Sequence, residues 1–438
     1  MVENAYSFDE DHQKNGPFNN NSHETTMTKH TQQKRRQGVI YLNNAGQAWI
    51  SPAVEDVGKH QISLPPWEMH ADEDQATIRQ LFATLIEAEA KDIAIMPSTA
   101  FATTFAARNI QRMWEQEKLD QNKNKNKNKI LVINDQMCSA VYPWQEFCDE
   151  EKEDNNSSSN DTLSLRLKIV PYPTHGKNWT EMIVEALTED VLVACLPPLH
   201  WSDGALIDLK QIGEICRQKN ILFIVDATQA VGIMHCSVKE IQPDVLACSV
   251  HKWLRGPSGA SLVYVSSNWH SDWQPLDQHG RSRDLPGGSA WDASKNDMGP
   301  NGYPEKYFDD ARKFDSGGKP NPILLPMLRK AMEEVVENVD LKTAQSQLQV
   351  LIKPLVEWAV ANNFSLTTGK HACHLIGIRP NFLTAQQMLD ICSKLEKEHN
   401  IFVAVRCGAF RISPYLDTTP NDIDKFIEIL SSLIKEIQ

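Results

Sequence analysis

The sequence has 438 residues, of which 41% are hydrophobic and 23% charged, which is ordinary for a globular protein with a sizeable core and room for two domains. The formal net charge of -13 argues against a nucleic-acid partner, because phosphate backbones bind basic surfaces. Nine cysteines, an odd number without C-x-x-C pairs or Cys/His metal spacing, predict free thiols in a reducing compartment and no metal site.

Residues 1–37 form a compositional unit of their own. They are polar, acidic before they are basic, and lack the apolar core of a secretory signal, so we expect a disordered tail. The basic residues 34–36 are interpreted as a short solvated charge run, with a nuclear signal as the alternative. No apolar stretch reaches the length of a membrane span, so we expect no membrane contact and a cytoplasmic location.

The next predicted elements lead to a possible phosphate cradle. A strand at residues 38–43 is followed by small residues that let a backbone approach a ligand closely, with a plain turn as the alternative. An amphipathic helix at residues 74–89 and a strand at 93–96 come next. Ser98 and Thr99 then begin a helix, and the unpaired N–H groups and hydroxyls at a helix start can bind a phosphate. The alternative is that these residues only cap the helix.

Two low-complexity segments interrupt the strands that follow. Residues 122–129 repeat Asn-Lys and residues 149–161 are acidic and rich in Ser and Asn, so both are predicted to be surface insertions. Strands are expected at residues 130–133 and 191–196. His200 follows the second strand, where a histidine serves either structure or a site.

Asp226 follows a continuous apolar run. Residues 221–225 are typical of a strand buried on both faces, and the helix predicted at 209–217 gives β-α-β spacing with a right-handed parallel crossover. An acid at the carboxyl end of a parallel strand points into the crevice where α/β folds bind ligands. An ordinary helix cap is the alternative.

Lys252 lies at a polar corner between two apolar runs. Residues 245–248 lead into Ser249, His251 and Lys252, and residues 260–265 follow three turn-forming positions, so the pattern predicts strand, corner, strand. Partial burial at such a corner lowers the pKa of an amine and leaves it able to form a Schiff base. A solvated loop lysine is the alternative.

The C-terminal part mixes helices and strands. A helix is expected at residues 338–362, strands at 374–378, 402–405 and 410–413, and helices at 385–398 and from 422, as in an α+β domain.

Asp226 and Lys252 together suit one cofactor. Pyridoxal phosphate (PLP) needs a carboxylate at its ring nitrogen, a lysine for its aldehyde and donors for its phosphate. Ser249 and His251 stand beside the lysine as candidate phosphate donors.

The runs D-A-T-Q-A-V-G at residues 226–232 and S-V-H-K-W-L-R-G-P-S-G at 249–259 resemble the class V aminotransferases. This group of fold-type I PLP enzymes includes cysteine desulfurases, isopenicillin N epimerase, kynureninase and the C–S lyase of ergothioneine synthesis. The resemblance implies an α/β fold with a large domain at residues 38–335, built on a mostly parallel, seven-stranded type of sheet. It also implies a small α+β domain at residues 336–438; as an alternative, part of residues 38–70 belongs to this small domain. The resemblance further implies a homodimer.

The resemblance assigns roles to individual residues. Either His200 or Trp201 contacts the oxygen on the cofactor ring, and Arg406, in a V-R-x-G motif, clamps the substrate α-carboxylate, with a surface salt bridge as the alternative. The implied catalytic residue is Lys252. The implied cofactor-binding set is Ser98, Thr99, Met137, His200, Asp226, Gln229, Ser249, His251 and Lys252, and the substrate-binding set is Asn44, Ala45 and Arg406.

The sequence also departs from the family pattern. Met137 replaces a ring-stacking residue that is commonly His or aromatic, and a thioether cannot move protons. Gly318 replaces a threonine of the loop that reaches the partner subunit's phosphate in dimers, and Arg411 occupies the position of the sulfur-accepting cysteine of one desulfurase branch. Cys407 lies nearby and is interpreted as a structural thiol.

These features favour an enzyme that acts on an amino acid through a Schiff base at Lys252. The preferred reaction is β-elimination at a cysteine derivative, which cleaves the C–S bond. Epimerisation or transamination of an amino acid, and a non-catalytic PLP-binding scaffold, are the alternatives.

Overall fold

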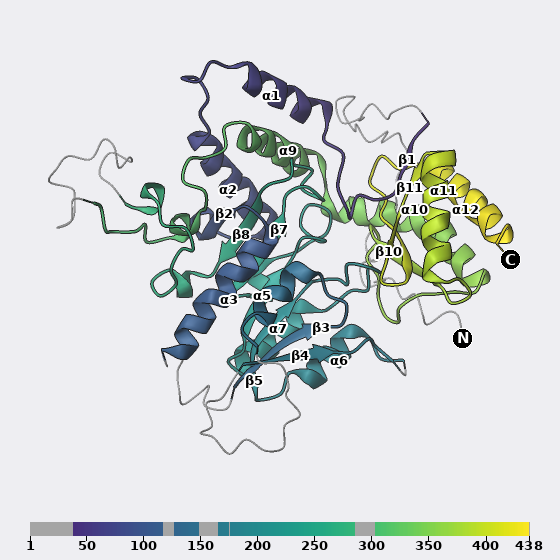
Figure 1. Ribbon diagram of the computed structural model, residues 1–438, viewed down its shortest axis with the longest axis horizontal. Coiled ribbons are helices and arrows are strands. Elements are labelled where there is room, and N and C mark those ends of the chain that lie inside the picture. The colour runs from purple at the N-terminus through teal and green to yellow at the C-terminus, as the bar shows by residue number, and fades with distance from the viewer. Residues whose placement is uncertain (1–37, 117–126, 149–164, 175, 285–302, 438) are drawn as a thin grey trace, which may run out of the picture.

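The structure is a computed structural model that describes residues 38–116, 127–148, 165–174, 176–284 and 303–437 (Figure 1). The predicted tail, the second insertion and most of the first lie outside the described residues. For Lys127 the surface prediction is wrong, because its side chain is buried and its Nζ donates to the backbone oxygens of Lys219 and Asn220. These carbonyls follow the end of a helix, where an ammonium group finds unpaired acceptors.

A seven-stranded, mostly parallel sheet forms the centre of the larger part of the molecule, as predicted. The strand order is β2-β8-β7-β6-β5-β3-β4, and only the pairings of β8 with β2 and β7 are antiparallel. The strands are β2 (Ile93–Met96), β3 (Lys129–Ile133), β4 (Arg166–Val170), β5 (Val191–Leu196), β6 (Leu222–Asp226), β7 (Val245–Ser249) and β8 (Ser261–Val265).

Helices cover both faces of this sheet. Leu131 and Ile133 pack in one hydrophobic cluster, whereas Ile130 and Val132 of the same strand pack in the other, as the two-residue period of a strand requires. The first cluster includes side chains of α2 (Asp72–Ile86) and α7 (Leu209–Gln218), and the second includes those of α3 (Thr99–Glu115). Burial on both faces explains why the strands read as continuous apolar runs.

Further helices flank the sheet and connect it to the C-terminal part. Several of them are short and lie in the connections between strands. They are α1 (Pro52–Ser63), α5 (Tyr142–Gln145), α6 (Trp179–Ala186), α8 (Val238–Ile241) and α9 (Leu324–Asn338).

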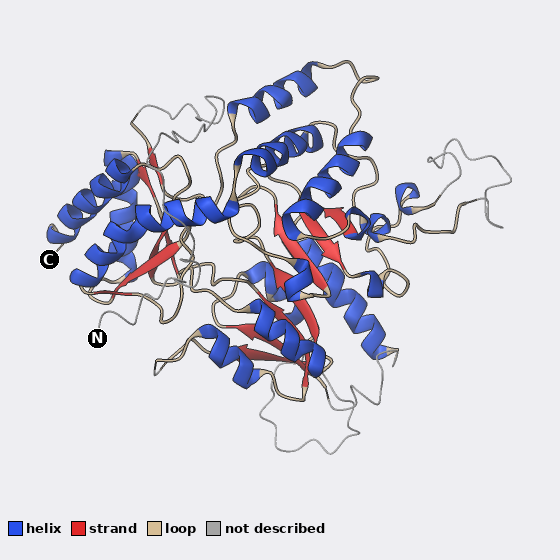
Figure 2. Ribbon diagram, turned by 180° about the vertical axis from the view of Figure 1, so that it is seen from behind, coloured by secondary structure: helices blue, strands red, loops and turns tan. Residues whose placement is uncertain are grey.

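A second, four-stranded antiparallel sheet lies in the C-terminal part, apart from the first sheet in Figure 2. Its order is β12-β13-β10-β9, from β9 (Phe364–Ser365), β10 (Ile376–Pro380), β12 (Ala404–Arg406) and β13 (Ala409–Ile412). The helices α10 (Leu341–Ala361), α11 (Ala385–His399) and α12 (Pro420–Lys435) belong to the same region.

The start of the described chain joins this C-terminal region. The strand β1 (Ile40–Tyr41) pairs in parallel with β11 (Ile401–Phe402), and Asn43 bridges to Ser413. The boundary expected between residues 335 and 336 stays a prediction. Within the described ranges, no helix is long and apolar enough to cross a membrane.

His374 is a buried contact between the two regions. Its Nε2 donates to the backbone oxygen of Gln229 at 2.7 Å, its Nδ1 accepts from the side chain of Gln345 at 3.4 Å, and the ring meets Trp253 edge-on with centroids 4.7 Å apart. Burial lowers the pKa of His374 to about 4.

We predict that His374 makes the fold sensitive to acid. Its pKa is lower in the folded state than in the unfolded state, so between about pH 6.5 and pH 4 the unfolded chain binds a proton that the folded chain excludes. Stability from this residue is therefore complete above pH 6.5 and falls by about 2 kcal/mol at pH 5. His374→Gln, which keeps an N–H donor but does not titrate, should show a correspondingly smaller loss of unfolding free energy between pH 7.5 and pH 5. Equal losses in the two proteins would contradict this assignment.

Candidate active site

The corner that carries Lys252 closes one side of a cavity of about 330 Å³. The strands β7 and β8 pair antiparallel up to Ser249 and Ser261, and Lys252 lies in the connection between them. The cavity is in the size range of small-molecule sites. Burial lowers the pKa of Lys252 to about 8, so an appreciable fraction of this amine is neutral and nucleophilic near neutral pH.

Asp226 lines the same cavity from the end of the neighbouring strand. The strand β6 pairs in parallel with β7, with Asp226 opposite Ala247, so the carboxyl ends of the two strands bring Asp226 and Lys252 together. Its Oδ1 accepts from the Thr228 backbone N–H at 3.1 Å. Burial raises the pKa of this carboxyl, and the Thr228 hydrogen bonds and nearby Lys252 oppose the rise. A cationic ligand group would keep Asp226 ionised.

A cluster of hydroxyls lies where α3 begins. Ser98 caps the helix by accepting from the Phe101 N–H, and Thr99 is its first residue. The Thr99 Oγ1 is 2.6 Å from the Ser249 Oγ and 3.3 Å from the Thr228 Oγ1. The four residues that carry these hydroxyls, Ser98, Thr99, Thr228 and Ser249, all line the cavity. The N-terminus of a 17-residue helix together with these hydroxyls suits a phosphate group.

Three more of the predicted residues also line the cavity, namely Ala45, Met137 and His251. Met137 precedes a short 3-10 helix (Cys138–Ala140) that follows β3. Burial lowers the pKa of His251, with Lys252 as a further cause, so the ring is neutral at neutral pH. A neutral imidazole can donate or accept a hydrogen bond here.

Asn44 and Gln229 are not among the residues that line the cavity. The Asn44 side chain donates to the Ser413 backbone oxygen at 3.0 Å. The Gln229 side chain donates to the Ala45 oxygen at 3.1 Å and accepts from the Trp253 indole at 2.8 Å. In this structure both amides hold the backbone around Ala45 in place, and direct contact with a ligand stays a prediction.

Between His200 and Trp201, the structure brings only Trp201 to the cavity. The Trp201 indole donates to the Asp135 backbone oxygen at 2.6 Å. The His200 ring is 0% exposed and stacks on Trp179 with centroids 5.3 Å apart. Its nitrogens lie 3.1 Å from the Asn134 backbone oxygen and 2.9 Å from the Ser202 hydroxyl. His200 thus supports the loop behind the cavity, and a role at the cofactor stays a prediction.

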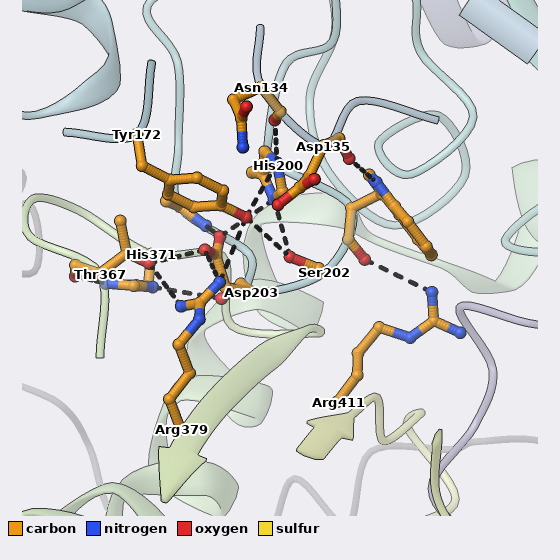
Figure 3. Close-up of polar contacts among 12 residues, drawn as sticks. Asn134, Asp135, Tyr172, His200, Ser202, Asp203, Thr367, His371, Arg379 and Arg411 are labelled. Carbon is orange, nitrogen blue, oxygen red and sulfur yellow. Dashed lines mark hydrogen bonds and ion pairs between the residues drawn. The ribbon is translucent and has the colours of Figure 1, made fainter. Parts of the chain in front are cut away.

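A buried ion pair connects the loop that contains His200 to the C-terminal sheet (Figure 3). Asp203, 0% exposed, accepts from Arg379 of β10 at 2.9 Å and from the Thr367 hydroxyl at 2.6 Å. Arg379 also donates to the Tyr172 hydroxyl at 3.3 Å. A carboxylate with this many donors is stable when buried, so the loop of residues 200–204 is held by both regions of the molecule.

Two arginines of the C-terminal sheet complete the cavity wall. Arg406, at the end of β12, is exposed, and its Nη1 donates to the Val405 oxygen at 2.8 Å. Arg411 of β13 is 2% exposed, and it donates to the Trp201 backbone oxygen at 3.4 Å and to the Asn43 side chain at 3.2 Å. Burial, with Arg406 as a further cause, lowers the pKa of Arg411 to about 10.

The sequence prediction missed Arg411 as a site residue and also missed Thr228. The available signal for Arg411 was a charged residue inside the otherwise apolar strand A-F-R-I, because a charge that is buried in a strand needs a partner or a ligand. For Thr228 the signal was a hydroxyl two residues after the strand-end acid.

The family model described as aminotransferase class-V matches residues 40–426. The chain belongs to this family. Its members are PLP-dependent enzymes. Among curated relatives, this family member is 23% identical over 357 residues to an uncharacterized aminotransferase, YcbU, of Bacillus subtilis (strain 168), and the match covers 81% of this chain and 82% of that protein.

Two further comparisons concern sulfur chemistry. A mitochondrial cysteine desulfurase of Arabidopsis thaliana is 22% identical over 421 residues, with 91% of this chain and 83% of that protein covered. A solved complex of the cystine C-S lyase C-DES with its product, cysteine persulfide, superposes with a TM-score of 0.73 at 15% identity and covers 90% of this chain and 98% of that chain. At this identity the structural match supports the fold.

The side chains of this class-V family member fit PLP. The cavity presents an amine with a lowered pKa, a half-buried carboxylate on the adjacent strand, and hydroxyls at a helix N-terminus. Lys252 would hold the aldehyde, Asp226 the ring nitrogen, and Ser98, Thr99 and Ser249 the phosphate. Met137 offers an apolar, polarisable contact to a ring.

Proposed function

We propose that this protein binds PLP at Lys252 and cleaves the C–S bond of a cysteine derivative by β-elimination. The observation that carries the proposal is the composition of the cavity wall, which combines the PLP donor set with two guanidinium groups and contains none of the nine cysteines. PLP, when bound, makes the Cα proton of an amino acid more acidic by withdrawing electrons.

Lys252 is the group that would remove this proton. Its lowered pKa of about 8 suits proton transfer near neutral pH. Loss of the Cα proton and departure of the sulfur from Cβ, followed by addition of one water molecule, convert an S-substituted cysteine into a thiol, pyruvate and ammonium. Asp226 would keep the ring nitrogen protonated, and an arginine would fix the α-carboxylate.

The absence of a cavity cysteine favours release of the sulfur over its transfer to the enzyme. Cys407, the thiol closest in sequence to Arg411, is not among the cavity-lining residues, and burial raises its pKa. A protonated thiol is a poor nucleophile. The sulfur is therefore expected to leave as part of a free product.

Epimerisation is the second candidate reaction. It requires a proton donor on each side of Cα, and Met137 occupies the position at which relatives commonly carry a proton-conducting histidine. Besides Lys252 and the ring-nitrogen partner Asp226, the described lining residues include His251 as a group that can carry a proton. Elimination needs only Lys252 and is therefore preferred.

The experiment supplies the holoenzyme with S-substituted cysteines and their sulfoxides, and quantifies pyruvate, ammonium and the sulfur product, which is a thiol from the thioethers and a sulfenic acid from the sulfoxides. Elimination predicts the three products in equal amounts. Alanine is the matched control because it has no leaving group at Cβ. Pyruvate from alanine without free ammonium would indicate transamination, and exchange of the Cα hydrogen without any keto acid would indicate epimerisation.

The assembly and location are also proposed. We infer a homodimer, supported by the loop at Gly317, which is exposed, and Gly318, which is half-buried; this loop corresponds to the segment that relatives extend toward a partner subunit. The nine free cysteines support a cytoplasmic, reducing environment.

A further inference from the structure

Arg411 is a buried guanidinium whose neighbours do not neutralise it. It is 2% exposed, its two hydrogen bonds go to neutral oxygens of Trp201 and Asn43, and its Nε is buried without a hydrogen-bond partner. Among the described residues, no carboxylate pairs with it or with Arg406. A buried arginine without an acid is costly, unless a bound anion supplies the missing acceptors.

The strand register places the two arginines at separate positions on one face of the sheet. In the antiparallel pair β12 and β13, Arg406 lies opposite Ala409, and Arg411 lies opposite Ala404. Arg411 is therefore two residues beyond the position that faces Arg406, which makes the two residues diagonal neighbours about 7 Å apart at their backbones. Both line the cavity that contains Lys252.

One carboxylate does not use both groups efficiently. A carboxylate has two oxygens, and the fork of a single guanidinium occupies both of them in a bidentate pair. The cofactor phosphate has its own donors at the start of α3, where Thr99 and Ser249 lie. The α-carboxylate of an amino acid would thus satisfy one arginine and leave the other for a second anion.

We infer that the substrate carries two anionic groups, the α-carboxylate and a second carboxylate or comparable anion on its side chain, with one arginine for each. This inference rests on the proposed function for the identity of the first group. It specifies the substrate class as acidic S-substituted cysteines, in which an anionic group is attached through the sulfur. Neither guanidinium moves a proton, so their part is binding and positioning.

The first test compares two cysteine derivatives of the same shape, S-carboxymethylcysteine and its neutral amide, S-carbamoylmethylcysteine. Holoenzyme is expected to favour the carboxylate at least 10-fold in kcat/KM, as a charge-assisted hydrogen bond of about 1.5 kcal/mol implies. Arg406→Gln and Arg411→Gln separate the two anion positions. In the variant that lacks the arginine for the side-chain anion, the kcat/KM ratio of the two substrates should fall to about one. In the variant that lacks the arginine for the α-carboxylate, kcat/KM should fall by similar factors for both substrates.

The second test does not depend on elimination. Calorimetric binding of succinate and of its monoamide, succinamate, to the holoenzyme should show at least 10-fold tighter binding of succinate, and this preference should be lost in either variant. Succinate preference without pyruvate from any cysteine derivative would refute the proposed elimination and retain the two-anion site. The inference would be overturned if the wild-type holoenzyme bound succinate and succinamate equally. It would also be overturned if both variants still bound succinate more tightly than succinamate by the wild-type factor.

Discussion

Replacing Lys252 with alanine is expected to lower turnover by at least about 10³-fold, because the variant loses both the amine that holds the cofactor and the group that moves the proton. The purified wild-type protein should absorb near the edge of the visible range through its covalent link to PLP, and the variant should lack this band. Burial around Lys252, which lowers its pKa to about 8, explains why this lysine reacts.

The matched control is Lys353→Ala, which removes an exposed lysine of α10 whose ion pair with Glu357 spans one helical turn. It should retain both the absorption band and the activity, since such a pair contributes little to stability. A colourless wild-type protein after reconstitution with PLP would refute the cofactor assignment, and an active, coloured Lys252→Ala protein would refute the role of the lysine.

Asp226→Asn should lower kcat by about 10²-fold to 10³-fold with much of the cofactor still bound, because an amide cannot stabilise a protonated ring nitrogen in a buried site. The side chain keeps its size, so the Thr228 N–H still has an oxygen to donate to. Turnover is measured per bound cofactor, so that reduced PLP binding does not mimic a slower reaction.

Asp208→Asn is the control for this substitution. Asp208 caps α7 by accepting from the Gln211 N–H at 3.0 Å, and asparagine caps helices equally well. Its kcat should be that of the wild type. An Asp226→Asn enzyme with an unchanged kcat per bound cofactor would show that the carboxylate is not needed for the reaction.

Much of the central sheet was predictable from local sequence. The strands at residues 93–96 and 191–196 were predicted with the same bounds, because a fully buried strand is a short apolar run between turn residues. β4 was missed, since it is an edge strand in which Arg166 and Ile169 are exposed. α1 was missed because only Val54 and Gly58 are buried, which leaves too few apolar positions to show a helical period.

The site was predictable where its residues follow strands in a motif, and less so elsewhere. Asp226, Lys252 and Thr99 line one cavity because each ends or follows a strand of one sheet. Gln229 lies in the same motif, yet its amide turns to Ala45 and Trp253, and only the packed structure shows that choice. Arg411 reaches the cavity from another sheet, a placement that no local pattern encodes.

The turn that contains Ala45 is held by residues near the other end of the chain, and this has a consequence for the order of folding. The Ala45 N–H donates to the Ser413 hydroxyl across a sequence separation of 368 residues, and β1 pairs with β11 near the other end of the chain. During synthesis this wall of the cavity must therefore wait until residue 413 has been made, while β3, β5 and β6 can pair much earlier. A nascent chain that ends before residue 413 would hold Asp226 and Lys252 in a cavity that still lacks its wall at Ala45, so competence to bind ligand should arise only after residue 413 has joined the fold.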